Sequence, residues 1–428
     1  MIGFYGGTCN NLYVFAKSLA DHGQPVTFIE DRKDNFPHSQ PVWEDVDCCF
    51  SSGFDYLNID WARFELDHGW IRPAWYQVPG SDRDEAGALF GKSRAPLNPF
   101  TRFTTARFLR KYPGGLSVFD KMLGCDFLIV CGIEPALLAM LTGRPYMIFP
   151  HGSDMRVAIG AQRKGTGWKG LLVEWLTARS FRQAAFVGSP LPDASAEVPR
   201  SAYRRLKDLR IERIPLPYRY RGRLPRPERL ARLKALFAGL DRELPAAEFY
   251  AFTPSRINFF WKGHDRLLRA IANNRDQVNI HFIFLGWGDD YLEATSFVAR
   301  HGLERYVTVL PVFLSKPYLF RFFEGIDFII DEFNGSGSYG TSLSEAMSCG
   351  CPVLTWISEM FDAPGWERPP VIQARSEEQI AEAIVKISSR QIDLDAQSEL
   401  TADWFRRVHG DDAVIRTLFD KIGKHLAS

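Results

Sequence analysis

Apolar runs of strand length alternate with helical patterns along almost the whole sequence. QPVTFIED and CDFLIVCG are such runs in the first half, and VNIHFIFLGWG and DFIIDEF are such runs in the second half. Amphipathic segments separate them. Continuous apolar strands separated by helices are typical of parallel sheets with helices on both faces. The sequence therefore predicts an α/β protein built from doubly wound, Rossmann-like domains.

The chain has 428 residues, more than one hydrophobic core usually holds, so two domains are expected. The proline- and arginine-rich segment PLPYRYRGRLPRPERL suits a linker between them. We predict an N-terminal domain over residues 1–215, a linker over 216–246 and a C-terminal domain over 247–400. Helices over 401–428 are expected to pack back across the domain boundary.

Composition excludes several classes of protein. A net charge of +1 argues against a nucleic-acid interface. The seven cysteines follow no metal-binding pattern, which is typical of reduced thiols in a cytoplasmic protein. The start, MIGFYGG, lacks the regions of a signal peptide. The longest apolar stretch carries Glu134 and Pro135 in its middle, so we expect a strand and a helix there, not a membrane span.

Two cations follow a predicted strand of the second domain. In TPSRINFFWKGHD, Arg256 and Lys262 lie after the strand and at the start of a helix. Ligands of open α/β sheets bind beyond the carboxyl ends of the strands, and a helix N-terminus with fixed cations suits a diphosphate. A single loop cation is usually only solvated. However, the loop Gly337–Gly340 leads into a second helix start on the same edge, with Thr341 or Ser342 able to cap it.

Glu345 lies about one turn inside that second helix. At this depth a carboxylate can accept two ribose hydroxyls of a ligand whose phosphates lie at the helix start. The alternative is a solvent-exposed helix glutamate. The surrounding sequence, AMSCGCPVLTW, favours a largely buried helix, in which an unpaired carboxylate would be costly.

Four segments in the second half, in order and spacing, resemble the donor site of retaining GT-B glycosyltransferases of family 4 (group 1). They are SRINFFWKGHDRLLRAIA, IFLGWGDD, VTVLPVF and SYGTSLSEAMSCGCPVL. In the first half, GFYGGTCNNLYVFAKSLADHGQPVTFI and YMIFPHGSDMR are similar to that family's glycine loop with its helix and to its His-Gly-x-Asp segment, whereas residues 50–120 match nothing. The resemblance implies GT-B architecture: two facing Rossmann-like domains, with a nucleotide-sugar donor held mainly by the second domain and an acceptor mainly by the first.

The resemblance also implies roles for single residues. Arg256 and Lys262 correspond to the diphosphate-binding pair and Glu345 to the ribose-binding glutamate. His151 corresponds to the histidine beside the sugar, and Asp154 either orients it or caps the following helix. The remaining donor-site positions are Gly6 and Gly7 near the reaction centre, Gly286, the backbone of Val312 and Phe313 facing the base, and the phosphate-facing turn of Gly340, Thr341 and Ser342.

The sequence departs from the family pattern at Gly337, where the family has a first glutamate that contacts the donor sugar. Asp331 or Glu332, at the end of the preceding strand, is predicted to replace it in part; the alternative is that backbone amides alone hold the sugar. A second departure is one extra residue between Arg256 and Lys262, in a turn that contains Phe259, Phe260 and Trp261.

These residues favour a glycosyltransferase of the hexosyltransferase type that acts in polysaccharide biosynthesis. Fixed cations and helix N-termini stabilise the charge that grows on the leaving diphosphate, so neither a metal nor a cofactor is expected. The resemblance implies retention of anomeric configuration. A GT-B epimerase or phosphorylase, or a non-catalytic nucleotide-sugar binder, remains open. A dehydrogenase is disfavoured because GFYGGT lacks the G-x-G-x-x-G spacing.

One basic and aromatic segment, LNPFTRFTTARFLRKYP, contains no acid. It interleaves Arg102, Arg107, Arg110 and Lys111 with Phe100, Phe103, Phe108 and Tyr112. Such a composition suits peripheral contact with the inner face of a membrane or a lipid-linked anionic acceptor. Its apolar residues form no clean helical stripe, which favours a solvated connecting segment instead.

Overall fold

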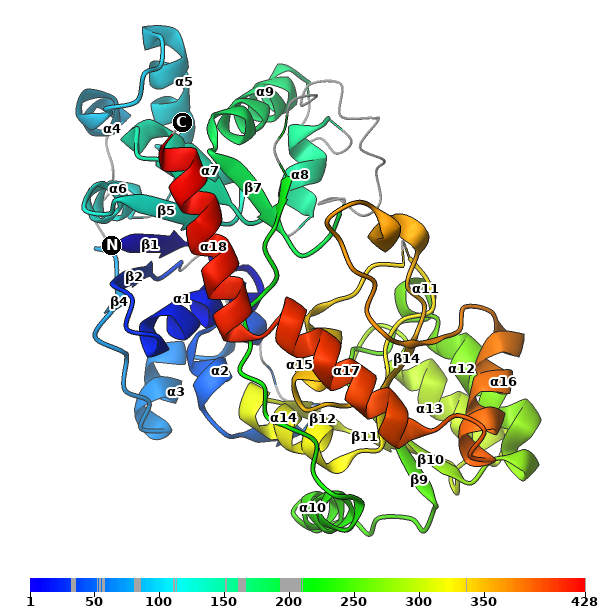
Figure 1. Ribbon diagram of the computed structural model, residues 1–428. Helices are drawn as coiled ribbons and strands as arrows, with labels where there is room; N and C mark the ends of the chain where they lie inside the picture. The colour runs from blue at the N-terminus through cyan, green and yellow to red at the C-terminus, as the bar shows by residue number, and fades with distance from the viewer. Residues whose placement is uncertain are drawn as a thin grey trace. The chain divides into compact units, whose positions relative to one another are not determined.

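The computed structural model describes the chain except for residues 32–35, 52, 54, 56, 57, 81–85, 111, 113, 151, 161–166, 193–208, 210, 336 and 428. The chain divides into two compact units. Unit 1 comprises Met1–Val42, Tyr56–Pro217 and Val414–Ser428, and unit 2 comprises Trp43–Asp55 and Tyr218–Ala413. Each unit contains one parallel sheet with its own helices, as predicted (Figure 1).

Unit 1 contains a parallel sheet of seven strands in the order β4-β2-β1-β5-β6-β7-β8. Its central strands are apolar because helices cover both faces. The chain winds outward from β1 in both directions, which makes the gap between β1 and β5 a topological switch point. The strands are β1 (Ile2–Tyr5), β2 (Val26–Ile29), β4 (Tyr76–Gln77), β5 (Phe127–Val130), β6 (Tyr146–Ile148), β7 (Phe186–Ser189) and β8 (Ile211–Arg213).

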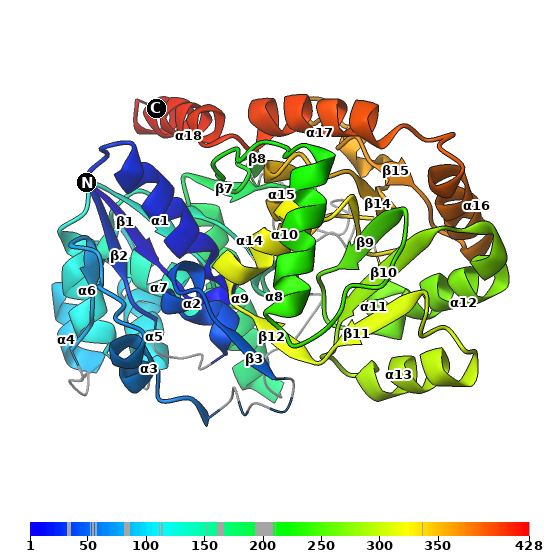
Figure 2. The same ribbon diagram turned by 90° about the horizontal axis from the view of Figure 1, so that it is seen from below.

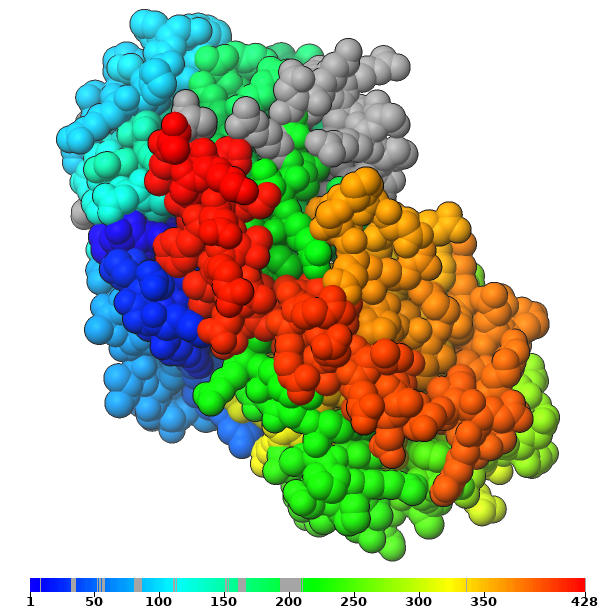
Figure 3. Space-filling model, viewed as in Figure 1, coloured from blue at the N-terminus to red at the C-terminus, as the bar shows by residue number. Residues whose placement is uncertain are grey.

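The helices of unit 1 include the last helix of the chain, whose residues return to this unit from Val414 onward. Lys421 pairs with Glu212, and the ring of His425 stacks on Phe186 at 4.9 Å. Figure 3 shows this helix on the surface, in red. The helices are α1 (Asn11–Asp21), α3 (Trp61–Asp67), α4 (Ala86–Lys92), α5 (Pro99–Leu109), α6 (Gly115–Leu123), α7 (Ile133–Thr142), α8 (Ser153–Ala158), α9 (Gly167–Gln183) and α18 (Asp411–Leu426).

Unit 2 contains a parallel sheet of six strands in the order β11-β10-β9-β13-β14-β15. The chain leaves β9 toward β10 and β11, and later returns beside β9 to continue outward from β13. The switch point of this sheet therefore lies between β9 and β13. The strands are β9 (Phe249–Thr253), β10 (Ile280–Leu285), β11 (Val307–Leu310), β13 (Phe328–Ile330), β14 (Val353–Thr355) and β15 (Ile372–Gln373).

The segment predicted to be a linker, 216–246, belongs to unit 2 from Tyr218 onward. It contains helix α10, which packs on α14 and is anchored by a buried ion pair between Arg229 and Asp327 at 2.9 Å (Figure 2). The helices of unit 2 are α10 (Arg226–Ala238), α11 (Phe259–Lys262), α12 (His264–Asn274), α13 (Tyr291–Arg300), α14 (Lys316–Gly325), α15 (Thr341–Ser348), α16 (Glu377–Ser388) and α17 (Leu394–Val408).

A segment near the N-terminus, Trp43–Asp55, belongs to unit 2, which the sequence did not predict. The short helix α2 (Val42–Asp45) leads into strand β3 (Cys49–Ser51), which pairs antiparallel with β12 (Val312–Leu314). Trp43 is fully buried and packs on Phe50 and Phe313, with ring centroids 5.8 and 5.2 Å away. The segment Trp43–Asp55 thus belongs to unit 2, in which Trp43 is buried.

Neither a disulfide nor a membrane-spanning helix is present in the part of the chain that the structure describes, which includes all seven cysteines.

Candidate functional site

The residues predicted to bind phosphate lie at the switch point of unit 2. Arg256 and Lys262 follow β9, and Asp331 and Glu332 follow β13, the neighbouring strand of the sheet. Parallel strands end at one edge, so these two loops meet there. Asn334 joins them by donating its side-chain amide to the carbonyls of the α11 turn, 2.8 Å from the oxygen of Phe260.

Lys262 lies between two carboxylates. Its Nζ is 2.6 Å from Oε2 of Glu332 and 4.0 Å from Oδ1 of Asp331. Burial alone would lower the pKa of Lys262, but the two carboxylates outweigh it, and the pKa is raised. Lys262 is therefore a fixed positive charge at the edge of the sheet.

Asp331 and Glu332 differ in what they contact. Burial, and then the neighbouring Asp331, raises the pKa of Glu332 against the opposing effect of Lys262. The side chain of Asp331 is 2% exposed, and its Oδ2 has no hydrogen-bond partner among the described residues. A buried acceptor without a donor is costly, so it indicates a place where a ligand hydroxyl can donate.

Arg256 is more exposed, at 48%, and its nearest carboxylate is Asp289, 4.0 Å away. The turn that follows it is rigid. Asn258 accepts a hydrogen bond from the amide of Trp261 at 2.6 Å and donates one to Asp289 at 2.9 Å. The guanidinium of Arg256 thus extends from a fixed loop without a close salt bridge in the described chain.

His264 was missed by the sequence analysis, although it stands two residues after Lys262. It is fully buried, and burial together with the Lys262 charge lowers its pKa to about 3. Its Nδ1 accepts the backbone N–H of Asn258 at 3.1 Å. The proton of this neutral ring is therefore assigned to Nε2, which lies 3.5 Å from the hydroxyl of Ser255. His264 thus fixes the loop that carries Arg256.

The start of α15 differs from the prediction that Thr341 or Ser342 caps it. Gly340 is the N-cap residue, with φ −92° and ψ −178°, and no side chain accepts a hydrogen bond there. The first-turn amides of this eight-residue helix are thus available to an anion, which the helix dipole also favours. A β-carbon built on Gly340 would have no neighbour within 4 Å, so the space in front of the helix is open.

Glu345 is buried, which confirms one prediction and excludes the solvent-exposed alternative. The residue is 2% exposed. Its Oε1 contacts Nζ of Lys316, the first residue of α14, and lies 3.5 Å from the hydroxyl of Tyr218. Its Oε2 has no partner among the described residues. Lys316 and Tyr218 carry no sequence signal, because both reach Glu345 from distant parts of the chain.

Gly337 has no room for the glutamate of the family pattern. Its φ is +69°, which disfavours any residue with a β-carbon. A β-carbon there would lie 2.6 Å from both the amide nitrogen and Cβ of Ser358, and 2.9 Å from the ring of Trp356. The Gly337 carbonyl also accepts the Ser358 amide at 2.9 Å. The loop that carries Ser358 thus fills the space that a glutamate side chain at position 337 would need.

Gly286 lies at a close contact between the ends of two strands, whereas Val312 and Phe313 lie within strand β12. The amide of Gly286 donates to the Leu310 carbonyl at 2.6 Å, and a β-carbon on Gly286 would lie 2.7 Å from that oxygen. Val312 and Phe313 are buried in β12, and Phe313 pairs with Phe50 of β3. The predicted contact of their backbone with a base stays a prediction.

The predicted residues of unit 1 gather at its own switch point. Gly6 has φ +130°, and a β-carbon there would lie 2.2 Å from the carbonyl oxygen of Cys131, so only glycine fits. The amide of Gly7 lies 3.4 Å from Asp31. Asp154 is buried in the first turn of α8 and accepts the amide of Gly132 at 3.3 Å. His151 lies outside the described residues, so its role stays a prediction.

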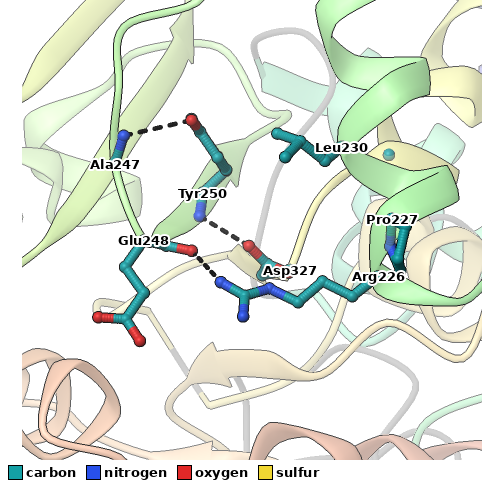
Figure 4. A pocket seen from close by; sticks show the side chains of 8 residues that line it. Arg226, Pro227, Leu230, Ala247, Glu248, Tyr250 and Asp327 are labelled. Atoms are coloured by element: carbon teal, nitrogen blue, oxygen red, sulfur yellow. Dashed lines mark hydrogen bonds between the residues drawn. The ribbon is translucent and has the colours of Figure 1, made fainter.

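A separate cavity of about 320 Å³ lies beside the amino end of β9 (Figure 4). Its polar groups are already paired: the amide of Tyr250 donates to Asp327 at 2.9 Å, and Arg226 donates to the carbonyl of Glu248. The cavity is therefore part of the packing of α10 within unit 2.

Residues 249–390 match the family model of Glycosyl transferases group 1. Solved structures share the fold over nearly the whole chain. HepE from Anabaena is 14% identical over 99% of both chains, with a TM-score of 0.60. Sucrose-phosphate synthase from Thermosynechococcus elongatus is 15% identical over 100% of this chain and 99% of its own, with a TM-score of 0.59. No curated protein matches the sequence.

Because the sequence identities are this low, the structural similarity establishes only the fold. It is the predicted GT-B fold of glycosyltransferases. The matched residues lie within unit 2 and include Arg256, Lys262, Asp331 and Glu345. The chain therefore has the GT-B fold, and residues 249–390 of its second unit are similar to the group 1 glycosyl transferases.

Proposed function

We propose that this protein transfers a hexosyl group from a nucleotide-diphosphate sugar to a glycan or a lipid-linked acceptor, with retention of anomeric configuration and without a metal or cofactor. One observation carries the proposal: one matched domain contains Lys262, the start of α15 without a side-chain cap, and a buried oxygen of Glu345 that has no partner among the described residues. A cation, a helix N-terminus and a carboxylate are the groups that a diphosphate and a ribose require.

Each group has a distinct part in the proposed reaction. Breaking the bond between the anomeric carbon and the diphosphate leaves negative charge on the phosphate. Lys262, Arg256 and the α15 amides stabilise that charge in fixed positions, so they need not reorganise as it grows. Front-side attack, with the leaving oxygen accepting the proton of the acceptor hydroxyl, retains configuration without an enzyme nucleophile.

HepE was crystallised with UDP and with UDP-glucose. Because this chain shares its fold, uridine nucleotides are the first candidates for the donor. A thermal-shift screen of uridine, guanosine and adenosine diphosphates and their sugars, in EDTA, tests the proposal. We expect stabilisation by one nucleoside diphosphate and by its sugars. If no nucleotide raises Tm at millimolar concentration, the proposal is wrong.

The same screen leads to assays that separate the alternatives. An epimerase converts the donor without an acceptor, a phosphorylase requires free phosphate, and a binder turns nothing over. Transfer to an acceptor with release of nucleoside diphosphate supports the proposal, and NMR of the product gives the anomeric configuration.

Glu345→Ala is expected to weaken binding of the bare nucleoside diphosphate about 10- to 100-fold. The reason is the loss of a charge-assisted hydrogen bond to ribose, worth about 1.5–3 kcal/mol. Calorimetry measures the affinity. Glu378→Ala, which removes an exposed carboxylate of α16, is the control and should leave the affinity unchanged. Unchanged affinity in Glu345→Ala would remove this residue from the ribose role.

Lys316→Met extends that test. Lys316 pairs with Oε1 of Glu345 and so holds the carboxylate in place. Lys316→Met breaks this buried pair, so the variant should bind the bare nucleoside diphosphate more weakly than the wild type. Calorimetry compares the two proteins, and an unchanged affinity would show that Lys316 does not position the carboxylate.

Asp331→Asn and Glu332→Gln test which acid contacts the sugar. We expect Asp331→Asn to impair turnover or binding of the intact donor while sparing the bare nucleotide, because its unpartnered Oδ2 is the free acceptor. Glu332 forms an ion pair with Lys262, so Glu332→Gln should weaken binding of both the intact donor and the bare nucleotide. If neither variant selectively impairs the intact donor, the sugar is held by backbone groups.

A further inference from the structure

Helices α5 and α9 are neighbours in unit 1 (Figure 1). Residues of both helices line a groove of about 760 Å³, which is separate from the residues assigned to the donor. Phe100, Phe108, Leu171 and Leu172 are among its apolar lining residues. The two helices meet where the ring of Phe100 lies 6.4 Å from that of Trp175. The volume suits a ligand of small-molecule size.

The rim of the groove exposes large apolar side chains. Phe100 and Trp168 are each 69% exposed, Phe103 is 50% exposed and Leu171 is 45% exposed. Phe100, Trp168 and Leu171 line the groove. Phe103 lies on α5, three residues after Phe100, and its ring packs on Phe90 at 6.2 Å. Contiguous exposed apolar groups mark a contact surface, whereas single ones are ordinary.

Three cations line the same groove: Arg107, Arg110 and Lys169. All three are exposed, and within the described part of the chain none of them forms an ion pair. No acid is among the lining residues. The chain as a whole has a net charge of only +1, so this positive charge is local. Its complement is a ligand that is anionic at one end and apolar at the other.

We propose that the α5–α9 groove docks the protein on an anionic lipid bilayer. A hydrocarbon chain enters between the helices, and lipid phosphates meet Arg107, Arg110 and Lys169. The indole of Trp168 lies at the boundary, where tryptophan is favoured because one end is apolar and the other is hydrated. This inference does not depend on the donor site, which lies in unit 2.

Vesicle co-sedimentation tests the charge requirement. The wild-type protein should bind vesicles of equal phosphatidylcholine and phosphatidylglycerol far better than phosphatidylcholine alone. The variant Arg107→Gln/Arg110→Gln/Lys169→Gln should bind about 100-fold more weakly, because each cation near an anionic surface contributes ~1 kcal/mol, about fivefold.

A second triple variant controls for net charge: Lys234→Gln/Arg242→Gln/Lys424→Gln removes three exposed cations far from the groove in sequence and should bind like the wild type. An equal loss of vesicle binding in both triple variants would show that only the net charge matters, and it would overturn the proposal. No binding of the wild-type protein to anionic vesicles would also overturn it.

Two further variants test the apolar part. Phe100→Ser/Trp168→Ser should abolish binding, whereas Leu66→Ser/Ile71→Ser, which removes side chains that are 76% and 86% exposed on and near α3, should not. Insertion should shift the fluorescence of the wild-type protein to shorter wavelength, and Trp168→Phe should remove that shift. Retention of both binding and shift in the groove variants would show that the groove is not the docking site. Circular dichroism and the thermal unfolding midpoint serve as the folding check in every variant.

Discussion

Lys262→Ala is expected to lower kcat/KM for sugar transfer by about one to two orders of magnitude. The variant removes the proposed charge-assisted contact with the leaving diphosphate, worth about 1.5–3 kcal/mol. Arg256→Ala should act in the same direction, because we assign both cations to the same diphosphate. Steady-state rates at subsaturating donor give the loss. Arg266→Ala, which removes a cation of α12 whose guanidinium donates to the Arg375 carbonyl, is the matched control and should retain the wild-type rate.

The Lys262 variant also leaves Glu332 buried beside an empty position, and breaking a buried pair destabilises a protein. The double variant Lys262→Ala/Glu332→Ala separates the two effects. Its stability should recover toward the wild type, while the transfer rate stays low. If the rate recovers together with stability, Lys262 supports the fold and does not bind phosphate.

Gly337→Ala is expected to lower the free energy of unfolding by about 2–5 kcal/mol. Left-handed backbone costs a residue with a β-carbon roughly 1–2 kcal/mol, and the overlap with Ser358 adds about 1–3 kcal/mol. Chemical denaturation followed by circular dichroism measures the change. Gly337→Glu, which restores the residue of the family pattern, should be at least as destabilised and should gain no activity.

Two neighbouring glycines separate the effect of the positive φ from the effect of the missing space. Gly335 also has a positive φ, +78°, but the nearest neighbour of a β-carbon there is Oε1 of Glu332 at 3.7 Å, an ordinary van der Waals distance, so Gly335→Ala should cost only about 1–2 kcal/mol. Gly340 has neither restriction, and Gly340→Ala should be close to neutral. Equal stabilities of all three variants would show that the close packing at Gly337 is not what excludes a side chain.

The fold was predictable because its strands are apolar without interruption. Residues 328–330 and 249–253 could be recognised as buried strands from composition alone, and the polar residues after them then had to lie at one edge of the sheet. The burial of Glu345 followed from the apolar residues around it. Local sequence sufficed for these features because each depends on one element and its neighbours.

Other features depend on contacts between distant segments. Residues 43–55 belong to unit 2 because β3 pairs with β12, more than 260 residues away in the sequence, and because Trp43 is buried there. The pairing of Lys316 with Glu345 joins two helices. The lack of space at Gly337 is created by Ser358 and Trp356. None of these contacts leaves a pattern in the local sequence.

The central claim is that the edge of the sheet formed by β9 and β13 holds the diphosphate of a nucleotide sugar. A crystal structure with the nucleoside diphosphate selected by the thermal-shift screen tests it most directly. We predict phosphate oxygens about 3 Å from Lys262 Nζ and from the first-turn amides of α15, with a ribose hydroxyl on Glu345. A nucleotide bound elsewhere, with the Lys262–Glu332 pair unchanged and Oε2 of Glu345 still without a partner, would contradict the account.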